Sequence, residues 1–260
     1  MNIFDDVRAA LVETDPQKKC ALTAALHPLP GEFERPAIQP AELVGVPGRP
    51  ERPELVHPRD VIHRGLGTQQ GRAAMVHAVA HIEFNAINLA LDAALRFREM
   101  PCDYHRDWIS VAQDEARHFG MLSGRLGELG YRYGDFSAHN GLWEAAEKTS
   151  HDVLARMALV PRVLEARGLD VTPGIIHRLV EIGDAETASV LRIILDEEVR
   201  HVAIGTRWFR WLCAKRGLEP NGTFKQLLAE HGMRIRLPLN RAARAAAGFD
   251  EAELEDVVSP

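Results

Sequence analysis

The sequence predicts an all-α protein, a four-helix bundle preceded by a proline-rich arm and followed by a helical tail. Beyond residue 70, four long segments repeat apolar residues at helical spacing, and no run of alternating β-branched residues competes with them. The 260 residues, 46% of them hydrophobic, are enough for one large domain with a substantial core.

The first 60 residues differ in character from the rest. Residues 4–26 alternate apolar and polar positions at helical spacing and predict one N-terminal helix. Between Pro28 and Pro58 lie eight of the 15 prolines, which remove backbone donors and fix φ, so no regular helix or central strand is expected there. We interpret 27–60 as an extended arm that is ordered only if it packs against the rest. A disordered linker is the alternative.

Glycine and proline punctuate the remaining chain. The long helices are expected at about 70–98, 104–129, 142–168 and 185–214, with a short helix at 174–182. In the tail we expect short helices around Leu237-Pro238 and Gly248, with Asp250 as an N-cap. The resulting division is 1–60 for the N-terminal helix and arm, 61–217 for the bundle and 218–260 for the tail.

Composition excludes several classes of protein. Thirty-one basic and 37 acidic residues give a net charge of −6, which argues against a general binder of nucleic acids or anionic membranes. No stretch of about 18 uncharged apolar residues is present, and the N-terminus lacks a leader pattern. The three cysteines are odd in number and far apart, which fits a reducing cytoplasm. A basic run in the tail is either a solvated helix face or a contact for an acidic substrate or RNA; it comprises Arg234, Arg236, Arg241 and Arg244.

The sharpest chemical signal is a pair of pentads, Asp114-Glu115-Ala116-Arg117-His118 and Glu197-Glu198-Val199-Arg200-His201. Each contains Glu-x-x-His, which puts a carboxylate and an imidazole one helical turn apart, where both can bind one metal ion. The motif alone is weak, because chance gives roughly one copy in a chain of this composition. A third copy, Glu54 to His57, falls in the proline-rich arm, and we interpret it as accidental.

The glutamate and histidine of each pentad interrupt an apolar helical stripe and therefore point into the core. The stripes include Trp108, Val111, Phe119 and Leu122 in the first helix and Ile194, Leu195, Val202 and Phe209 in the second. A buried carboxylate costs several kcal/mol unless a cation compensates it. Salt bridges to Arg117 and Arg200 are the alternative, but each arginine is two positions from its glutamate and points elsewhere.

Glu83 is the one charge on the apolar line of the 70–98 helix, and we expect it to be buried. The opposite face of this helix is polar, and we interpret it as solvated or subunit-facing rather than as a zinc pair. Its members are His77, His81, Asn85, Asn88 and Asp92.

The third long helix must supply the matching acid, and its candidates are Glu144, Glu147 and Glu165. The helix dipole alone explains acids at the predicted N-terminus, so we choose Glu165. Pro161 should kink this helix. Glu165 reaches the depth of Glu198 only if the 174–182 segment crosses the end of the bundle. The inventory is then one Glu from each of two helices and Glu-x-x-His from the other two, the ligand set of a di-iron or di-manganese site.

These motifs, with Ala80-His81-Ile82-Glu83 and the segment 163–170, resemble the ferritin-like superfamily, and most closely the domain-of-unknown-function 455 family within it. The resemblance covers essentially the whole chain. It implies the fold and the metals but no reaction; distant relatives include a tRNA hydroxylase and rubrerythrin-type peroxidases. In such relatives the acid before Glu-x-x-His often hydrogen-bonds a ligand histidine. Asp114 matches that position and Glu197 is one methylene longer, so these acids, with Arg117 and Arg200, would surround the ligands.

We expect two metal ions, with Glu83 and the first pentad holding one, Glu165 and the second pentad the other, and some carboxylates bridging. A carboxylate-rich, histidine-poor set suits iron best and manganese next. The expected function is a cytoplasmic oxidoreductase that acts with dioxygen or peroxide and a reductant on an unknown small molecule. Iron storage, a metal-free scaffold and a zinc or manganese hydrolase are the alternatives. Core packing is favoured over a radical relay for Trp108, and a homodimer stays open.

Overall fold

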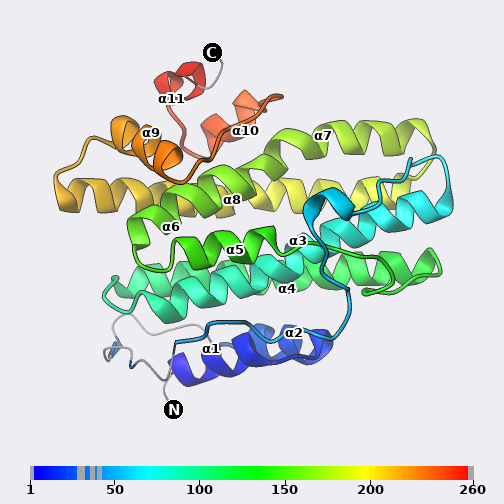
Figure 1. Cartoon of the computed structure of the whole chain (residues 1–260), viewed down its shortest axis with the longest axis horizontal. Coiled ribbons are helices and arrows are strands. Elements are labelled where there is room, and N and C mark those ends of the chain that lie inside the picture. The colour runs from blue at the N-terminus through cyan, green and yellow to red at the C-terminus, as the bar shows by residue number, and fades with distance from the viewer. Residues whose placement is uncertain (1–2, 28–32, 36–38, 40–42, 257–260) are drawn as a thin grey trace. The chain divides into compact units, whose positions relative to one another are not determined.

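The computed structural model describes residues 3–27, 33–35, 39 and 43–256. These residues are helical or irregular, and the described part of the chain contains no β-strand, so the predicted all-α class is confirmed. The chain forms two compact units, Met1–Glu144 (unit 1) and Ala145–Pro260 (unit 2). In Figure 1 unit 1 runs from blue to green and unit 2 continues to red. The four-helix bundle and the three-part division of the chain stay predictions.

Unit 1 begins with two helices, α1 (Ile3–Val12) and α2 (Pro16–Ala24), so the prediction of one helix over 4–26 is wrong. The break comes from Asp15, whose carboxylate accepts the backbone N–H of Lys18 at 2.8 Å, and from Pro16 at the first position of α2. Both residues are standard N-terminal signals of a new helix.

The described part of the arm packs against helices of unit 1, which contradicts the disordered-linker alternative there. Residues 28–32, 36–38 and 40–42 lie outside the described residues. The Gly48 N–H donates to Leu11 O at 2.9 Å. A Cβ on Gly48 would lie 2.2 Å from the carbonyl oxygens of Val12 and Glu13, so this close approach requires glycine. The arm also contains a short 3₁₀ helix, η2 (Pro58–Asp60).

Two long helices form the centre of unit 1: α3 (Gln69–Arg96) and α4 (Cys102–Glu128). Thr68 caps α3 by accepting the Gly71 N–H at 3.0 Å. By length and composition α3 could cross a membrane, contrary to the expectation from uncharged stretches alone. However, 67% of its most apolar 18-residue window is buried inside the protein, as in the core helix of a soluble protein.

The polar face of α3 is buried, so its interpretation as a solvated or subunit-facing surface is wrong. The loop that follows α4 covers the histidines of this face. His77 accepts the Gly134 N–H at 2.9 Å and stacks on Tyr133, while His81 Nδ1 lies 2.8 Å from the Tyr133 hydroxyl. Further along the helix, Asp92 pairs with Arg96 at 2.7 Å. Sequence periodicity cannot show that a loop will cover a polar stripe.

Unit 2 contains a nearly continuous helical segment followed by a second long helix. The segment consists of α6 (Val153–Leu159), a π-helix η3 (Val160–Glu165) and α7 (Ala166–Glu181); the second helix is α8 (Ala185–Arg216). The preceding α5 (Gly141–Lys148) is separate, because Asp152 caps α6 by accepting the Leu154 N–H at 2.9 Å.

The predictions of one helix over 142–168 and another over 174–182 are therefore wrong. Gly168 does not end the helix, and Pro173 lies inside α7. A proline removes the N–H that would bond to the carbonyl four residues earlier. That carbonyl, on Leu169, instead accepts the side-chain amide of Asn240 at 3.2 Å.

The tail consists of α9 (Pro220–Glu230), α10 (Arg241–Ala246) and α11 (Glu251–Asp256). The predicted N-cap at Asp250 is confirmed, since its carboxylate accepts the Glu253 N–H at 2.8 Å. Arg244 is buried and donates two hydrogen bonds to Asp170 at 2.9 and 2.7 Å, so it does not belong to a basic surface.

Candidate metal centre

Helix pairing in unit 1 brings Glu83 and Glu115 to the same level. A short connection joins α3 to α4, so the two helices run antiparallel. Glu83 lies 13 residues before Arg96, the end of α3, and Glu115 lies 13 residues after Cys102, the start of α4. In antiparallel neighbours, residues equally far from the connection lie side by side.

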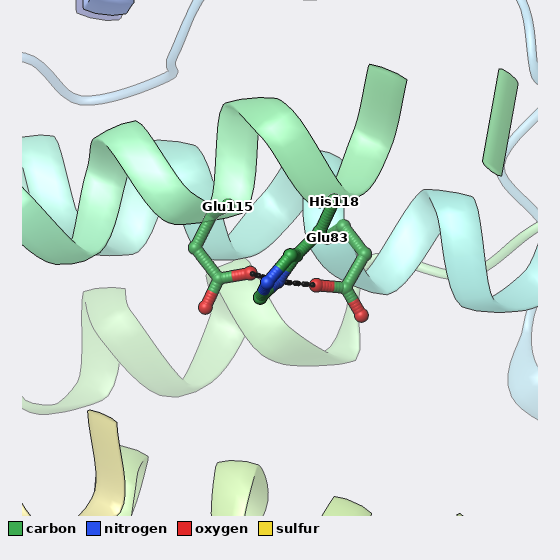
Figure 2. A group of neighbouring side chains, drawn as sticks. All are labelled: Glu83, Glu115 and His118. Carbon is green, nitrogen blue, oxygen red and sulfur yellow. Dashed lines mark hydrogen bonds and ion pairs between the residues drawn. The ribbon is translucent and has the colours of Figure 1, made fainter. Parts of the chain in front are cut away.

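The three unit 1 candidates form one buried cluster (Figure 2). The His118 Nδ1 lies 3.3 Å from Glu83 Oε2 and 3.3 Å from Glu115 Oε2. One ligand atom from each residue falls within 4.8 Å of the other two. Glu83 is 5% exposed, Glu115 is 1% exposed and His118 is fully buried, so the burial predicted from the apolar stripes is confirmed.

Burial and mutual charge shift the protonation of this cluster. Burial raises the pKa of Glu83 well above its ordinary value, and the neighbouring charge of Glu115 raises it further. Burial alone would lower the pKa of His118, but its hydrogen bonds to Glu115 and Glu83 and their negative charges raise it to about 10. A cation that enters the cluster would displace protons, as metal ions do at carboxylate and histidine sites.

Unit 2 carries the second pair. The His201 Nδ1 lies 3.2 Å from Glu198 Oε2. His201 is fully buried and Glu198 is 9% exposed, so both side chains of this second Glu-x-x-His face inward as predicted.

Glu165 is the last residue of the π-helix, in which the Ala166 N–H bonds to Pro161 O five residues earlier. Single π-helical turns occur frequently at functional sites. Within unit 2 as the structure describes it, no third carboxylate, histidine or cysteine places a ligand atom within 4.8 Å of both Glu198 and His201. The role of Glu165 as a ligand therefore stays a prediction.

The register of unit 2 nevertheless places Glu165 at the level of His201. A Cβ on Gly205 would lie 2.3 Å from the Pro161 ring, so α8 and η3 are in close contact there. Pro161 lies 20 residues before the end of α7, and Gly205 lies 20 residues after the start of α8. Counted in the same way, Glu165 and His201 are each 16 residues from the connection. Glu165 reaches this level along the helix pair because α7 continues to Glu181.

The residues predicted to surround the ligands lie nearer the surface. The Asp114 carboxylate accepts a hydrogen bond from Arg117 at 3.1 Å. Arg117 and Arg200 are exposed and Glu197 is half-buried, whereas Glu115 and Glu198 are buried. The two arginines thus point away from the core, as the sequence predicted.

The third Glu-x-x-His and Trp108 fit the interpretations given to them from the sequence, an accidental motif and core packing. Glu54 and His57 of the third Glu-x-x-His are exposed. Trp108 is buried in the core and packs edge-on against Tyr104. Sequence reasoning missed Gly205, whose isolated place inside a 32-residue helix was a usable signal of close helix packing.

Two comparisons with known proteins give matches that cover nearly the whole chain. A family model described as "Protein of unknown function (DUF455)" matches residues 12–255. An uncharacterized protein of Haemophilus influenzae is 43% identical over 269 residues, which cover 97% of this chain and 92% of that protein. No solved structure matches the chain. The chain therefore belongs to the DUF455 family.

Proposed function

We propose that the protein binds two transition-metal ions per chain, with iron favoured and manganese second, and uses them in oxidation–reduction chemistry. The observation that carries the proposal is the cluster of Glu83, Glu115 and His118 in unit 1. It gathers two carboxylates and one imidazole in the core, each buried by at least nine-tenths.

The donor chemistry fits these metals. Carboxylate oxygens with a single imidazole nitrogen suit iron and manganese better than copper or zinc. Two carboxylates within reach of one imidazole repel each other when ionised, and a divalent cation removes that repulsion more completely than one proton can. The buried triad is thus a place where a cation is worth more than at an exposed acidic cluster.

Unit 2 supports the second ion. Glu198 and His201 repeat the arrangement of Glu115 and His118, with a similar distance from nitrogen to carboxylate oxygen. Glu165 completes the set in the proposal, because it lies at the level of His201 beside a π-helical turn. The ligand inventory of the sequence supports the further proposal that both ions form one dinuclear, ferritin-like centre.

When bound, two iron or manganese ions would supply redox chemistry with dioxygen or peroxide. The residues of the chain hold and insulate them: the carboxylates give charge balance, and His118 offers its Nδ1 to both neighbouring acids. Val111, Leu122 and Phe119, all buried on α4, exclude water from this part of the core. An unknown small molecule and an external reductant are the partners in this proposal.

Metal analysis tests the proposal directly. Protein purified without chelator, or reconstituted anaerobically with ferrous iron, should contain about two ions per chain. Glu115→Gln and Glu198→Gln should each lose metal, while Glu54→Gln, from the exposed third Glu-x-x-His, should retain it. Less than about 0.3 ion per chain after reconstitution, or equal loss in all three variants, contradicts the proposal.

Iron oxidation separates an enzyme from a storage protein. Protein loaded with two ferrous ions is exposed to air, and further ferrous iron is added while near-ultraviolet absorbance is followed. We expect oxidation to stop after about one centre's equivalent of iron without a reductant and substrate. Sustained oxidation of many ions per chain would contradict the oxidoreductase proposal and favour storage.

A further inference from the structure

The tail of unit 2 is bound along one face of the segment that carries Glu165. Arg167 donates to the carbonyl oxygens of Arg236 and Pro238 at 2.8 and 3.1 Å. Asp170 accepts two hydrogen bonds from Arg244. Phe249, Leu254 and Ala247 pack against Ala166, Leu169 and Val202 in one apolar cluster. Tail residues thus hold the helical turn that directly follows Glu165.

A further tail contact is made by a residue of the π-helix itself. The Arg162 side chain is fully buried and donates to the Glu253 carboxylate, which belongs to α11 and is 5% exposed. Three phenylalanine rings surround the guanidinium, with their centres 4.2 to 4.6 Å from its Cζ; they are Phe209, Phe224 and Phe249. Cation–π contacts and a directed hydrogen bond together hold a guanidinium in position.

Glu253 is itself held in place. Its backbone N–H donates to Asp250, its Oε2 accepts the Asp250 N–H at 2.9 Å, and Oε2 also accepts Arg210 from α8 at 3.2 Å. The first two bonds form a capping box at the start of α11. The carboxylate that Arg162 meets is therefore anchored both to α11 and to α8.

A π-helical turn needs such support. It inserts one residue relative to an α-helix and so rotates the side chains that follow by about 100°. Glu165 comes three residues after Arg162, and a return of η3 to regular α-helix would turn its carboxylate to another face. Pro161 contributes by packing on Gly205, but it fixes only the start of the turn.

We propose that Arg162 and Glu253 are a positioning pair, which keeps η3 in its π-helical form and so aims Glu165 at the metal ion of unit 2. This inference rests on the proposed function for the role of Glu165. The statement about η3 itself needs no metal. The two parts are therefore tested by different measurements.

The first measurement is amide hydrogen exchange in metal-free protein. Glu253→Gln should accelerate exchange of the Ala166 N–H, the donor of the i to i−5 bond, by at least tenfold. The matched control is Asp170→Asn, which weakens another buried tail ion pair outside η3 and should leave Ala166 protected. Unchanged protection of Ala166 in folded Glu253→Gln protein, or equal loss in the control, overturns the positioning of η3.

The second measurement is titration of the whole protein with Co²⁺, followed by its visible absorption spectrum. Glu253→Gln should lower the affinity for one of two Co²⁺ ions by about tenfold, which is a usual effect of changing residues that orient metal ligands. Glu165→Gln should lower the affinity for the same ion. The double variant Glu165→Gln/Glu253→Gln should then bind Co²⁺ as Glu165→Gln does. Wild-type-like binding of both ions by Glu253→Gln, or fully additive effects in the double variant, overturns the action through Glu165.

A second variant covers the case in which the buried Arg162 charge prevents folding of Glu253→Gln. The pair Arg162→Met/Glu253→Met removes both charges and keeps apolar volume among the phenylalanine rings, a replacement that proteins often tolerate. It should lose Ala166 protection and weaken the same Co²⁺ ion; retention of both would overturn the proposal. If wild-type protein binds no Co²⁺ while the exchange result holds, the proposed function fails and the positioning of η3 stands.

Discussion

The helix pairs α3–α4 and α7–α8 carry the same chemical pattern on different kinds of backbone. In unit 1, Glu83 and the Glu115-His118 turn lie on two regular α-helices and form a complete buried triad. In unit 2, Glu198 and His201 lie on a regular helix, but Glu165, the acid proposed to match them, is the last residue of a π-helical turn that contains Pro161. Pro173 lies further along, inside α7. The first pair brings its three residues together with side chains of its own two helices alone.

The difference shows what irregular backbone requires. Both irregular features of the segment, the π-helix η3 and Pro173 inside α7, have contacts elsewhere in unit 2 that offset them. Pro161 packs on Gly205, Arg162 bonds to Glu253, and the carbonyl released by Pro173 bonds to Asn240. We infer that a ligand on such a segment can be adjusted through its supports, whereas a ligand on α4 can be changed only directly.

Metal removal should give the largest effect. An ion that binds only the folded protein adds about 4 kcal/mol at a thousandfold excess over its Kd, or roughly 10 °C in Tm for a chain of this size. We expect chelated protein to melt lower by about this amount at pH 7 in differential scanning calorimetry. A Tm that does not respond to chelator, in wild-type protein first shown to contain metal, would contradict the proposed sites.

The close contact of Gly205 with Pro161 distinguishes the two helix pairs next. Gly205→Ala should destabilise the protein by about 1–3 kcal/mol, because the new Cβ would overlap the proline ring. Gly124→Ala on α4 is the matched control: its Cβ would have open space and should stabilise the helix by up to about 1 kcal/mol. Urea unfolding measures the free energy of unfolding of both variants, and a Gly205→Ala protein that is as stable as wild type, or more stable, would show that the close packing at η3 is not required.

Buried Lys19 gives a pH dependence that belongs to unit 1. Burial lowers the pKa of Lys19 from 10.5 to about 7, although its ammonium donates to the carbonyls of Ala10 and Leu11 at the end of α1. Because the pKa in the folded state lies below that in the unfolded state, the folded protein pays the full free energy of burying the charged amine below pH 7. This destabilisation decreases as the pH rises and the amine loses its proton. Relative to Lys19→Met, wild-type protein should gain about 1.5 kcal/mol between pH 7 and 8.5. A pH-independent difference between the two proteins would contradict the shift.

The smallest effect is the coupling between Asn240 and Pro173. Asn240→Ala should cost about 1–2 kcal/mol, since it leaves the Leu169 carbonyl without its donor and removes the cap of α10. In a Pro173→Ala background the new backbone N–H can serve that carbonyl, so the same substitution should cost about 1 kcal/mol less. A double-mutant cycle by urea unfolding measures this coupling, and strict additivity would argue against the exchange of donors.

The contrast between the helix pairs also explains what the sequence could predict. The bounds of α3, α4 and α8 are close to those expected at 70–98, 104–129 and 185–214, since strong periodicity and local stop signals define them. The helix over 142–168 was wrong because Gly168 and Pro173 are local breakers, and the contacts that offset Pro173 come from residue 240, far along the chain.

For the candidate site, too, some features could be predicted from the sequence and others could not. Burial of Glu83, Glu115, His118, Glu198 and His201 could be predicted, because each interrupts an apolar stripe of a regular helix. The direction of Glu165 could not, since a π-helical turn changes the phase of the stripe without any fixed sequence signal. The buried histidine face of α3 was missed for a related reason: the loop that contains Tyr133 covers it.

The dependence of α7 on the tail imposes an order on biosynthesis. All three residues of the unit 1 cluster have been translated by residue 118, and α3 and α4 can pair while the ribosome is still making unit 2. The segment around Glu165 has to wait for Asn240, Arg244 and Glu253, which are translated more than 70 residues later. A nascent chain that stalls between residues 202 and 240 would therefore carry both Glu-x-x-His turns of the pentads while Arg162 of η3 still lacked Glu253.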